Sequence, residues 1–206
     1  MAAKVRMKKM KFIIASNNPG KIRDFNNILT ILGHEAVSLK EAGIVCDPEE
    51  NGTTFAENAY AKAKAIFDIC RQPVIADDSG LSVYALDGEP GVFSARYGGD
   101  GLDDKERCFL LMKNTEHLKE EEKDASFHCA LCCILSDGEV LTAEGEIKGK
   151  VINELRGENG FGYDPMFYSY ELEKTFGEAV DEEKNGISHR ARALKILAEK
   201  LKAKFN

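Results

Sequence analysis

Short apolar runs alternate along this chain with segments of helical periodicity, and this alternation limits the fold more than any other feature. The run Lys11–Ala15 predicts a buried strand, and Lys21–Leu32 behind it repeats apolar side chains at helical spacing. The pattern returns with the helix Thr54–Cys70, which starts with a capping box, and with the strand Pro73–Ala76. Strands separated by helices indicate an α/β protein.

The second half of the chain predicts a hairpin and two further helices. Ser126–Leu135 carries apolar residues on both alternating faces, as a central strand does, and Val140–Lys148 pairs with it across Asp137-Gly138. Asp104–Met112 and Ser188–Lys202 show helical patterns. Because a hairpin adds antiparallel pairing, we expect a long mixed sheet flanked by helices.

Length and composition exclude several classes of protein. A chain of 206 residues is long enough for one domain with its own core. The formal net charge of −7 argues against nonspecific binding to a nucleic-acid polymer. No apolar stretch approaches the ~20 residues that span a bilayer. The basic N-terminus lacks the apolar region of a signal peptide, so we expect a cytoplasmic protein without a membrane partner.

Six cysteines occur in the chain, and without an export signal we expect them to be reduced. Cys129-x-x-Cys132 has a spacing typical of metal sites, but it falls in a predicted strand and no second pair follows. Because a closed zinc site needs four ligands, the cysteines are interpreted as small buried apolar residues.

A polar turn, Ser16-Asn17-Asn18-Pro19-Gly20-Lys21, connects the first predicted strand to its helix. Backbone N–H groups at a helix start, a permissive glycine and an adjacent lysine together suit a phosphate group. The spacing is not that of a Walker loop. The alternative is an ordinary Asn-Pro-Gly turn with a solvated lysine.

A pair of acids, in Asp77-Asp78-Ser79-Gly80, follows an apolar strand and is predicted to form a turn before the strand Leu81–Tyr84. Adjacent carboxylates repel unless a cation or proton lies between them or they face apart. Oxygen ligands favour Mg²⁺ over zinc, and Glu49 and Glu50 offer further carboxylates. The alternative is a turn with solvated acids.

The glycine-rich segment Gly157–Asp164 offers the elements of a purine pocket. Its glycines allow close approach of the backbone to a ligand, Phe161 or Tyr163 has a flat face for a base, and Asp164 is an acceptor. The alternative is a tight loop whose aromatic side chains fill the core.

Basic residues gather at the start of the last predicted helix, where Ser188-His189-Arg190 follows Lys184. Cations in a first turn oppose the helix dipole at a cost of about 0.3–1 kcal/mol each. A bound anion or a base oxygen would compensate for this cost. The alternative is an exposed basic helix start.

Taken together and in this order, the motifs resemble the inosine triphosphate pyrophosphatase family, also called the dITP/XTP pyrophosphatases. The resemblance covers nearly the whole chain. The segments that carry it are Ser16–Lys21, Thr54–Ala59, Ala76–Leu81, Gly88–Tyr97, Gly160–Pro165 and Ile187–Arg190.

This resemblance implies an α/β fold with two lobes around a central substrate cleft, a homodimer, and a single domain over residues 1–206 with residues 1–10 as an N-terminal extension. It further implies a Mg²⁺-dependent hydrolase. The expected substrates are the small-molecule purine nucleoside triphosphates ITP, dITP and XTP, cut to monophosphate and pyrophosphate, an activity that cleanses the nucleotide pool.

The resemblance also assigns roles to individual residues. Asp78 is the proton acceptor, and Glu49 and Asp78 are the metal ligands, with Glu50 as the alternative to Glu49. The residues that bind substrate are Ser16, Asn17, Asn18, Pro19, Gly20, Lys21, Ser79, Phe161, Gly162, Tyr163, Asp164, Lys184, His189 and Arg190.

Other interpretations stay open at this point. The Maf-like nucleotide pyrophosphatases perform similar chemistry on other bases, but that family lacks the Ser-His-Arg ending. A non-catalytic nucleotide-binding protein would keep the pocket without turnover. A thiol or zinc protein would use Cys129, Cys132 and Cys133.

Overall fold

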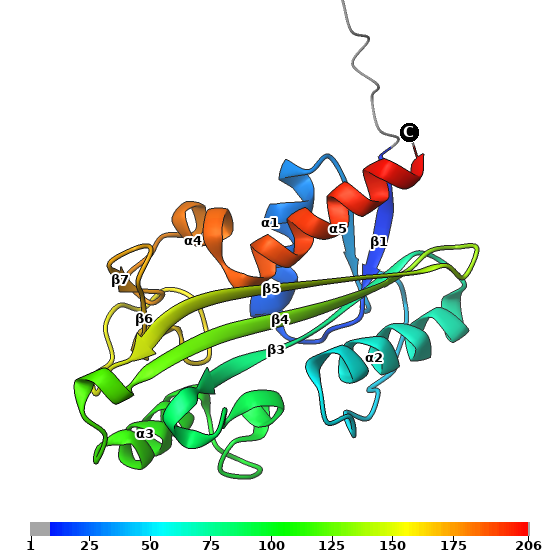
Figure 1. Ribbon diagram of the computed structural model, residues 1–206. Coiled ribbons are helices and arrows are strands. Elements are labelled where there is room, and N and C mark those ends of the chain that lie inside the picture. Colours follow the sequence, from blue (N-terminus) through cyan, green and yellow to red (C-terminus); the bar gives the residue numbers. More distant parts are fainter. Residues whose placement is uncertain (1–8, 206) are drawn as a thin grey trace, which may run out of the picture. The chain divides into compact units, whose positions relative to one another are not determined.

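The computed structural model describes residues 9–205, and its described part contains a seven-stranded sheet of order β2-β1-β3-β4-β5-β6-β7 (Figure 1). β1 pairs in parallel with β2 and β3, whereas β5 pairs antiparallel with β6 and β6 with β7. The predicted mixed sheet of an α/β protein is therefore confirmed. The strands are β1 (Lys11–Ile14), β2 (Glu35–Ser38), β3 (Val74–Val83), β4 (Asp124–Ile134), β5 (Val140–Val151), β6 (Phe167–Ser169) and β7 (Lys174–Thr175).

Helices form at each predicted position, with slightly shifted ends. The α-helices are α1 (Pro19–Ile31), α2 (Phe55–Cys70), α3 (Asp104–Thr115), α4 (Asp181–Ile187) and α5 (His189–Phe205). The 3₁₀ turns are η1 (Tyr84–Leu86), η2 (Gly91–Arg96), η3 (Glu120–Glu122) and η4 (Asp164–Met166). Over residues 9–205, none of the helices combines the length and the apolar character that crossing a bilayer requires.

The chain divides into two compact units, and β3, β4 and β5 each contribute residues to both. Unit 1 comprises the described residues through Asp78, then Ala130–Glu144 and the residues from Arg192 onward. Unit 2 comprises Ser79–Cys129 and Gly145–Ala191. The expected single domain over residues 1–206 stays a prediction. Of the expected extension over residues 1–10, residues 1–8 lie outside the described part.

Unit 1 is built around α2, which lies against one face of its sheet, while α1 and α5 lie on the opposite face (Figure 1). The helix starts at a capping box in which the Thr54 hydroxyl accepts from the Glu57 N–H and the Glu57 carboxylate accepts from the Thr54 N–H, both at 3.2 Å. Its apolar side buries Ile66 and Phe67 against the sheet. Each of these two side chains stabilises the fold by about 1.5–3 kcal/mol.

Unit 2 has a separate core in which aromatic rings pack among aliphatic side chains. Phe127 of β4 lies 4.7 Å from the ring of Phe167 and stacks on Phe176 at 5.9 Å. Leu111 of α3 is fully buried in the same cluster.

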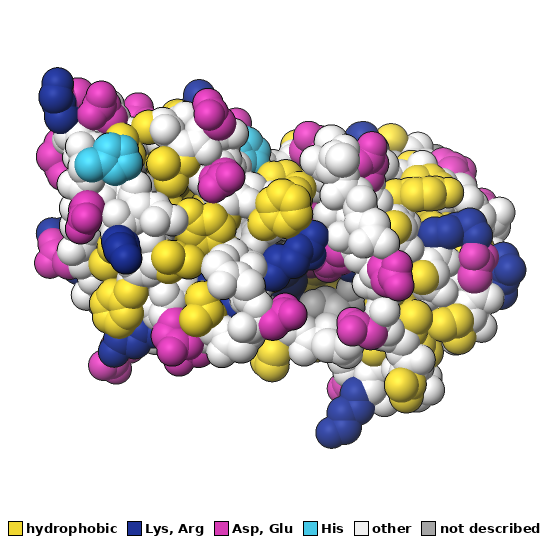
Figure 2. All heavy atoms as spheres, turned by 90° about the horizontal axis from the view of Figure 1, so that it is seen from below, with side chains coloured by type: hydrophobic (Ala, Val, Ile, Leu, Met, Phe, Trp, Pro, Cys, Tyr) yellow, Lys and Arg dark blue, Asp and Glu magenta, His cyan; other side chains and the backbone are white. Residues whose placement is uncertain are grey.

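On the face of the molecule drawn in Figure 2, acidic and basic side chains are interspersed.

The predicted turn at Asp77-Asp78-Ser79-Gly80 is wrong, because β3 continues through these residues as one strand. Gly80 makes this possible: a Cβ there would lie 2.3 Å from the carbonyl oxygen of Gly91 and 2.4 Å from Oγ of Ser94. The Leu81 N–H donates to the same Ser94 Oγ at 2.9 Å. A turn-like sequence is thus kept extended by its tertiary partners.

Candidate functional site

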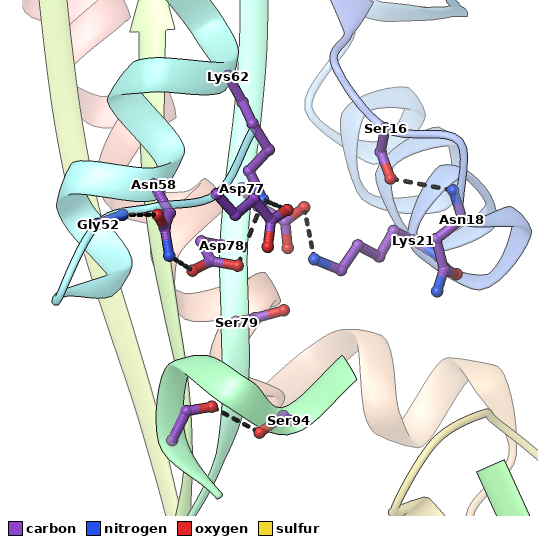
Figure 3. A network of polar contacts seen from close by, with 12 residues as sticks. Ser16, Asn18, Lys21, Gly52, Asn58, Lys62, Asp77, Asp78, Ser79 and Ser94 are labelled. Carbon is purple, nitrogen blue, oxygen red and sulfur yellow. Dashed lines mark hydrogen bonds and ion pairs between the residues drawn. The ribbon is translucent and has the colours of Figure 1, made fainter. Parts of the chain in front are cut away.

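The two adjacent acids of β3 point to opposite sides of the strand, as successive residues of a strand do (Figure 3). Asp77 and Asp78 are only 1% and 5% exposed. On one side, Nζ of Lys21 from α1 lies 3.3 Å from Oδ1 of Asp77. On the other side, Nζ of Lys62 from α2 lies 3.3 Å from Oδ1 of Asp78. Of the arrangements that allow adjacent acids to coexist, the structure has them facing apart, each beside a lysine.

The second carboxylate oxygen of Asp78 has a neutral partner. The Nδ2 group of Asn58 donates to Oδ2 of Asp78 at 2.9 Å. Burial raises the pKa of Asp78, and this effect outweighs the lowering by Lys62 and Asn58. A carboxylate with a raised pKa is a stronger base, which suits the predicted role of Asp78 as a proton acceptor.

Lys62 is a buried cation held among acids. Burial alone would lower its pKa, but Asp77, Asp78 and Glu50 more than compensate, and the pKa is raised. Its Nζ contacts Oε1 of Glu50 at 2.8 Å in addition to Asp78. The ammonium group therefore carries positive charge between two carboxylates.

Glu50, rather than Glu49, is the acid that shares this lysine with Asp78. The Oε2 atom of Glu49 instead accepts from Nδ2 of Asn51 at 2.8 Å. The geometry thus favours Glu50 as the carboxylate that accompanies Asp78, while the assignment of Glu49 as a metal ligand stays a prediction. The two glutamates are neighbours in a segment without regular structure, so sequence spacing does not separate them.

The carboxylates of Asp78, Glu49 and Glu50 offer oxygen atoms, the ligand type that Mg²⁺ prefers. Within the described residues, no group of three or more His, Cys, Asp or Glu side chains is placed to hold a metal ion. Mg²⁺ commonly binds through one or two carboxylates and completes its coordination with water and substrate phosphates. Glu50 and Asp78 fit such a partial site.

The polar turn after β1 forms the start of α1, as predicted. Asn18 caps the helix, and its Oδ1 accepts from the Lys21 N–H at 3.1 Å. Oγ of Ser16 accepts from the Asn18 N–H at 3.2 Å. Because the Lys21 side chain extends toward Asp77, the turn is tied to the acid pair, and the alternative of a fully solvated lysine is not observed.

Unit 2 gathers most of the residues predicted to surround the base. Arg190 is 1% exposed, and its Nη2 donates to Oγ of Ser79 at 3.0 Å. Two cations lie near the ring of Phe161: Nζ of Lys184 is 5.0 Å and Cζ of Arg190 is 5.9 Å from its centroid. Cations at such distances are attracted to an aromatic ring.

Asp164 organises the glycine-rich loop from within. Its Oδ2 accepts from the Phe161 N–H at 2.9 Å and from Nζ of Lys184 at 2.5 Å. Gly160 is required beside it, since φ is +77° and a Cβ would lie 2.1 Å from Oδ2 of Asp164. Both side chains of the Asp164–Lys184 pair are buried.

Tyr163 and His189 are packed into the core of unit 2. The hydroxyl of Tyr163 donates to the carbonyl oxygen of Ser94 at 2.9 Å, and burial raises its pKa. His189 stacks on Phe127 with centroids 4.9 Å apart. Of the two aromatic residues considered for base stacking, Phe161 is therefore the one whose ring is not committed to the core. Gly162 donates its N–H to Oδ2 of Asp104 at 2.8 Å.

The predicted site residues thus fall into two groups, one in each unit. Unit 1 holds the polar turn and the acid pair, and unit 2 holds Ser79 with the residues predicted to surround the base. Sequence reasoning assigned no role to Asn58 and Lys62. The helical spacing could have indicated a role for these two residues. They lie one turn apart on the side of α2 that also buries Ala59 and Ala63, and a buried polar side chain needs a hydrogen-bonding partner.

The cysteines do not gather into a site in the described structure. All six are free thiols. Cys129 and Cys132 are three positions apart on β4, so strand alternation sends them to opposite faces. Burial raises the pKa of Cys132 to about 11.

The Ham1 family model matches residues 12–200. The chain belongs to the Ham1 family. A relative named dITP/XTP pyrophosphatase from Bacillus subtilis is 45% identical over 191 residues, covering 93% of this chain and 96% of that protein. A second relative of that name, from Thermus thermophilus, is 46% identical over 193 residues, covering 94% of this chain and 92% of that protein.

Solved structures of the family have the same fold. The Ham1 protein of Staphylococcus aureus matches with a TM-score of 0.82 and 39% identity, over 94% of this chain and 99% of that chain. A HAM1 protein from Coxiella burnetii matches with a TM-score of 0.83 and 37% identity over the same shares.

Proposed function

We propose that this Ham1 family member hydrolyses the nonstandard purine nucleoside triphosphates dITP, XTP and ITP to the monophosphate and pyrophosphate, and that Mg²⁺ is its cofactor. Relatives over nearly the whole chain are named dITP/XTP pyrophosphatases. The observation that carries the proposal is the buried Asp78, held by Asn58 and Lys62 in unit 1.

Glu49 and Asp78 are the residues that would hold Mg²⁺, with Glu50, which shares Lys62 with Asp78, as the alternative to Glu49. Bound there, the ion would supply positive charge to the phosphates and acidify a water molecule. The support is the carboxylate oxygens of this region, together with the buried Lys62 and the partly exposed Lys21, which compensate part of the negative charge of the acids. Chelation of the metal is therefore expected to abolish turnover.

In the proposed reaction, Asp78 accepts a proton from the attacking water. The water oxygen bonds to the α-phosphorus, and the bond from that phosphorus to the pyrophosphate oxygen breaks. Lys21 neutralises charge that develops on the departing pyrophosphate, which is the kind of electrostatic contribution that dominates phosphoryl transfer. The Ser16–Lys21 turn binds phosphate oxygens through its backbone N–H groups.

Base selection is assigned to unit 2. Hypoxanthine and xanthine present a 6-oxo acceptor where adenine presents an amino donor, so a donor from Arg190 would be left unpaired against adenine. Phe161 offers its ring for stacking. Lys184 lies beside this ring and is held there by its hydrogen bond to Asp164. Ser79, His189 and Gly162 complete the proposed pocket.

We also propose a cytoplasmic homodimer. Six free cysteines are typical of a reducing compartment. Light scattering on the purified protein tests the dimer, and a monomeric mass would contradict it.

The reaction type is tested by hydrolysis of ITP in H₂¹⁸O. Attack on the α-phosphorus puts the label into the monophosphate and none into pyrophosphate. Label in released pyrophosphate or orthophosphate would show attack at another phosphorus and overturn the proposed reaction.

A further inference from the structure

Asn58 has an unusual set of partners for a residue in the first turn of a helix. Its side chain is fully buried. The Nδ2 group donates to Oδ2 of Asp78 at 2.9 Å, and Oδ1 accepts from the Gly52 N–H at 2.8 Å (Figure 3). One amide therefore joins the proposed catalytic carboxylate to the segment that carries Glu50.

Lys62 makes a second connection between the same two places. It lies one turn further along α2 and joins Oδ1 of Asp78 to Oε1 of Glu50. The two connections differ in chemistry. Lys62 supplies charge to both carboxylates, whereas Asn58 supplies a directed hydrogen bond and adds no charge to the site.

The backbone of Gly52 packs tightly against the side chain of Asn58 and leaves no space for a Cβ atom. A Cβ at Gly52 would lie 2.7 Å from Oδ1 of Asn58 and 2.8 Å from Cβ of Glu57. The backbone of Gly52 is thus pressed against the side chain that orients Asp78. The neighbouring residue Glu57 fixes the backbone that follows Gly52, because its carboxylate accepts from the N–H groups of Thr53 at 2.8 Å and Thr54 at 3.2 Å rather than contacting Asp78.

We propose that Asn58 is a positioning residue for the proposed reaction: through its bonds to Gly52 and Asp78 it sets the separation between the Asp78 carboxylate and the segment that carries Glu49 and Glu50. The inference rests on the proposed function. The amide orients Asp78 directly and anchors the backbone of Gly52, which lies next but one to Glu50, so its removal is expected to loosen both Asp78 and this segment.

The test compares Asn58→Ala with Glu57→Ala, a matched control that loosens the same segment without touching Asp78. Mn²⁺ binding is measured by the electron paramagnetic resonance signal of the free ion, without nucleotide, and kcat and KM are measured with ITP. Loss of a partner that orients a ligating carboxylate typically lowers metal affinity or activity about 10–100-fold. We expect Asn58→Ala to lose about that much in Mn²⁺ affinity and kcat, with KM nearly unchanged.

Glu57→Ala is expected to lower the unfolding temperature while Mn²⁺ affinity and kcat stay close to those of the unchanged chain. Gly52→Ala provides a second variant that retains Asn58 but displaces it. We expect it to weaken Mn²⁺ binding in the same direction.

Unchanged Mn²⁺ affinity and kcat in folded Asn58→Ala would overturn the inference alone. Equal losses in Glu57→Ala would also overturn it, because they would show a general effect of the helix start. If the unchanged chain neither binds Mn²⁺ nor releases pyrophosphate, the proposed function fails and the inference fails with it.

Discussion

The two units of this protein bury charge in opposite ways. In unit 1, the adjacent acids Asp77 and Asp78 dominate, and a lysine lies beside each. In unit 2, the cations Lys184 and Arg190 dominate, and they lie near the aromatic ring of Phe161. A buried carboxylate pair suits cations and proton transfer, whereas buried donors beside a ring suit a flat ligand with acceptor oxygens.

This difference separates two functions that a single nucleotide hydrolase needs. In the proposed function, unit 1 carries the groups for phosphate chemistry, and unit 2 carries the groups for recognising a base. The comparison therefore predicts that substitutions in unit 1 act mainly on kcat, and that substitutions in unit 2 act mainly on the choice of base or on stability.

The largest effect is expected from Asp78→Asn. The amide keeps the shape of the side chain but is not a base, so kcat with ITP should fall by about 10²–10⁴-fold, which is the usual contribution of a general base. The preference for ITP over ATP should persist in any residual activity. Steady-state kinetics with thermal unfolding as a check on folding measures both, and near-normal turnover would contradict the role of Asp78.

Asp164→Asn tests the buried ion pair of unit 2. The variant leaves Lys184 without its carboxylate, and breaking a buried pair in this way typically costs about 3–5 kcal/mol of unfolding free energy. The matched control is Asp137→Asn, which breaks an exposed pair with Lys204 and should cost less than about 1 kcal/mol. Urea unfolding compares the two variants. Equal losses of unfolding free energy would show that the buried Asp164–Lys184 pair stabilises the fold no more than the exposed pair does.

Arg190→Ala tests whether unit 2 selects the base. Loss of a hydrogen bond to a charged donor corresponds to about 1.5–3 kcal/mol, so the ratio of kcat/KM for ITP to that for ATP should fall about tenfold or more. Arg190→Lys is the matched variant: it keeps a cation at this position, without the guanidinium group, and should retain the fold. A ratio that stays at the value of the unchanged chain would contradict the assignment.

Local sequence signals predicted the parts of the fold that local chemistry determines. The helix expected over Thr54–Cys70 matches α2, because its capping box and apolar face are both encoded within the segment. The sequence predicts the hairpin from Asp137-Gly138, and in the structure Gly138 has a φ of +85°, which favours glycine. The short strands β2, β6 and β7 were not predicted, since each is fixed mainly by pairing with a neighbouring strand.

The one wrong prediction at the site has a physical cause. Asp77–Gly80 has the composition of a turn, but Lys21, Lys62 and Ser94 reach it from distant parts of the chain and hold it extended. The choice between Glu49 and Glu50 stays a prediction, and their different partners, Asn51 for Glu49 and Lys62 for Glu50, are not encoded in the spacing of the sequence. Residue types could be predicted from the motifs, whereas partners required the three-dimensional structure.

The smallest expected effect lies outside both groups of site residues. His34 in unit 1 is buried against Phe12, and burial lowers its pKa. The unfolded chain therefore binds a proton near the ordinary pKa of about 6.5 while the folded chain stays neutral, so stability falls as the pH drops through that value. Urea unfolding between about pH 7.5 and 5 should show a shallower decline for His34→Gln, and an identical decline would contradict the prediction.

The central claim is tested most directly by pyrophosphate release from ITP, dITP, XTP, GTP and ATP, each with Mg²⁺ and with excess chelator. The account predicts release from the first three, little from GTP or ATP, and none with chelator. Release from all five would contradict the assignment of base choice to unit 2, and release from none would contradict the proposed enzyme and leave a nucleotide-binding protein.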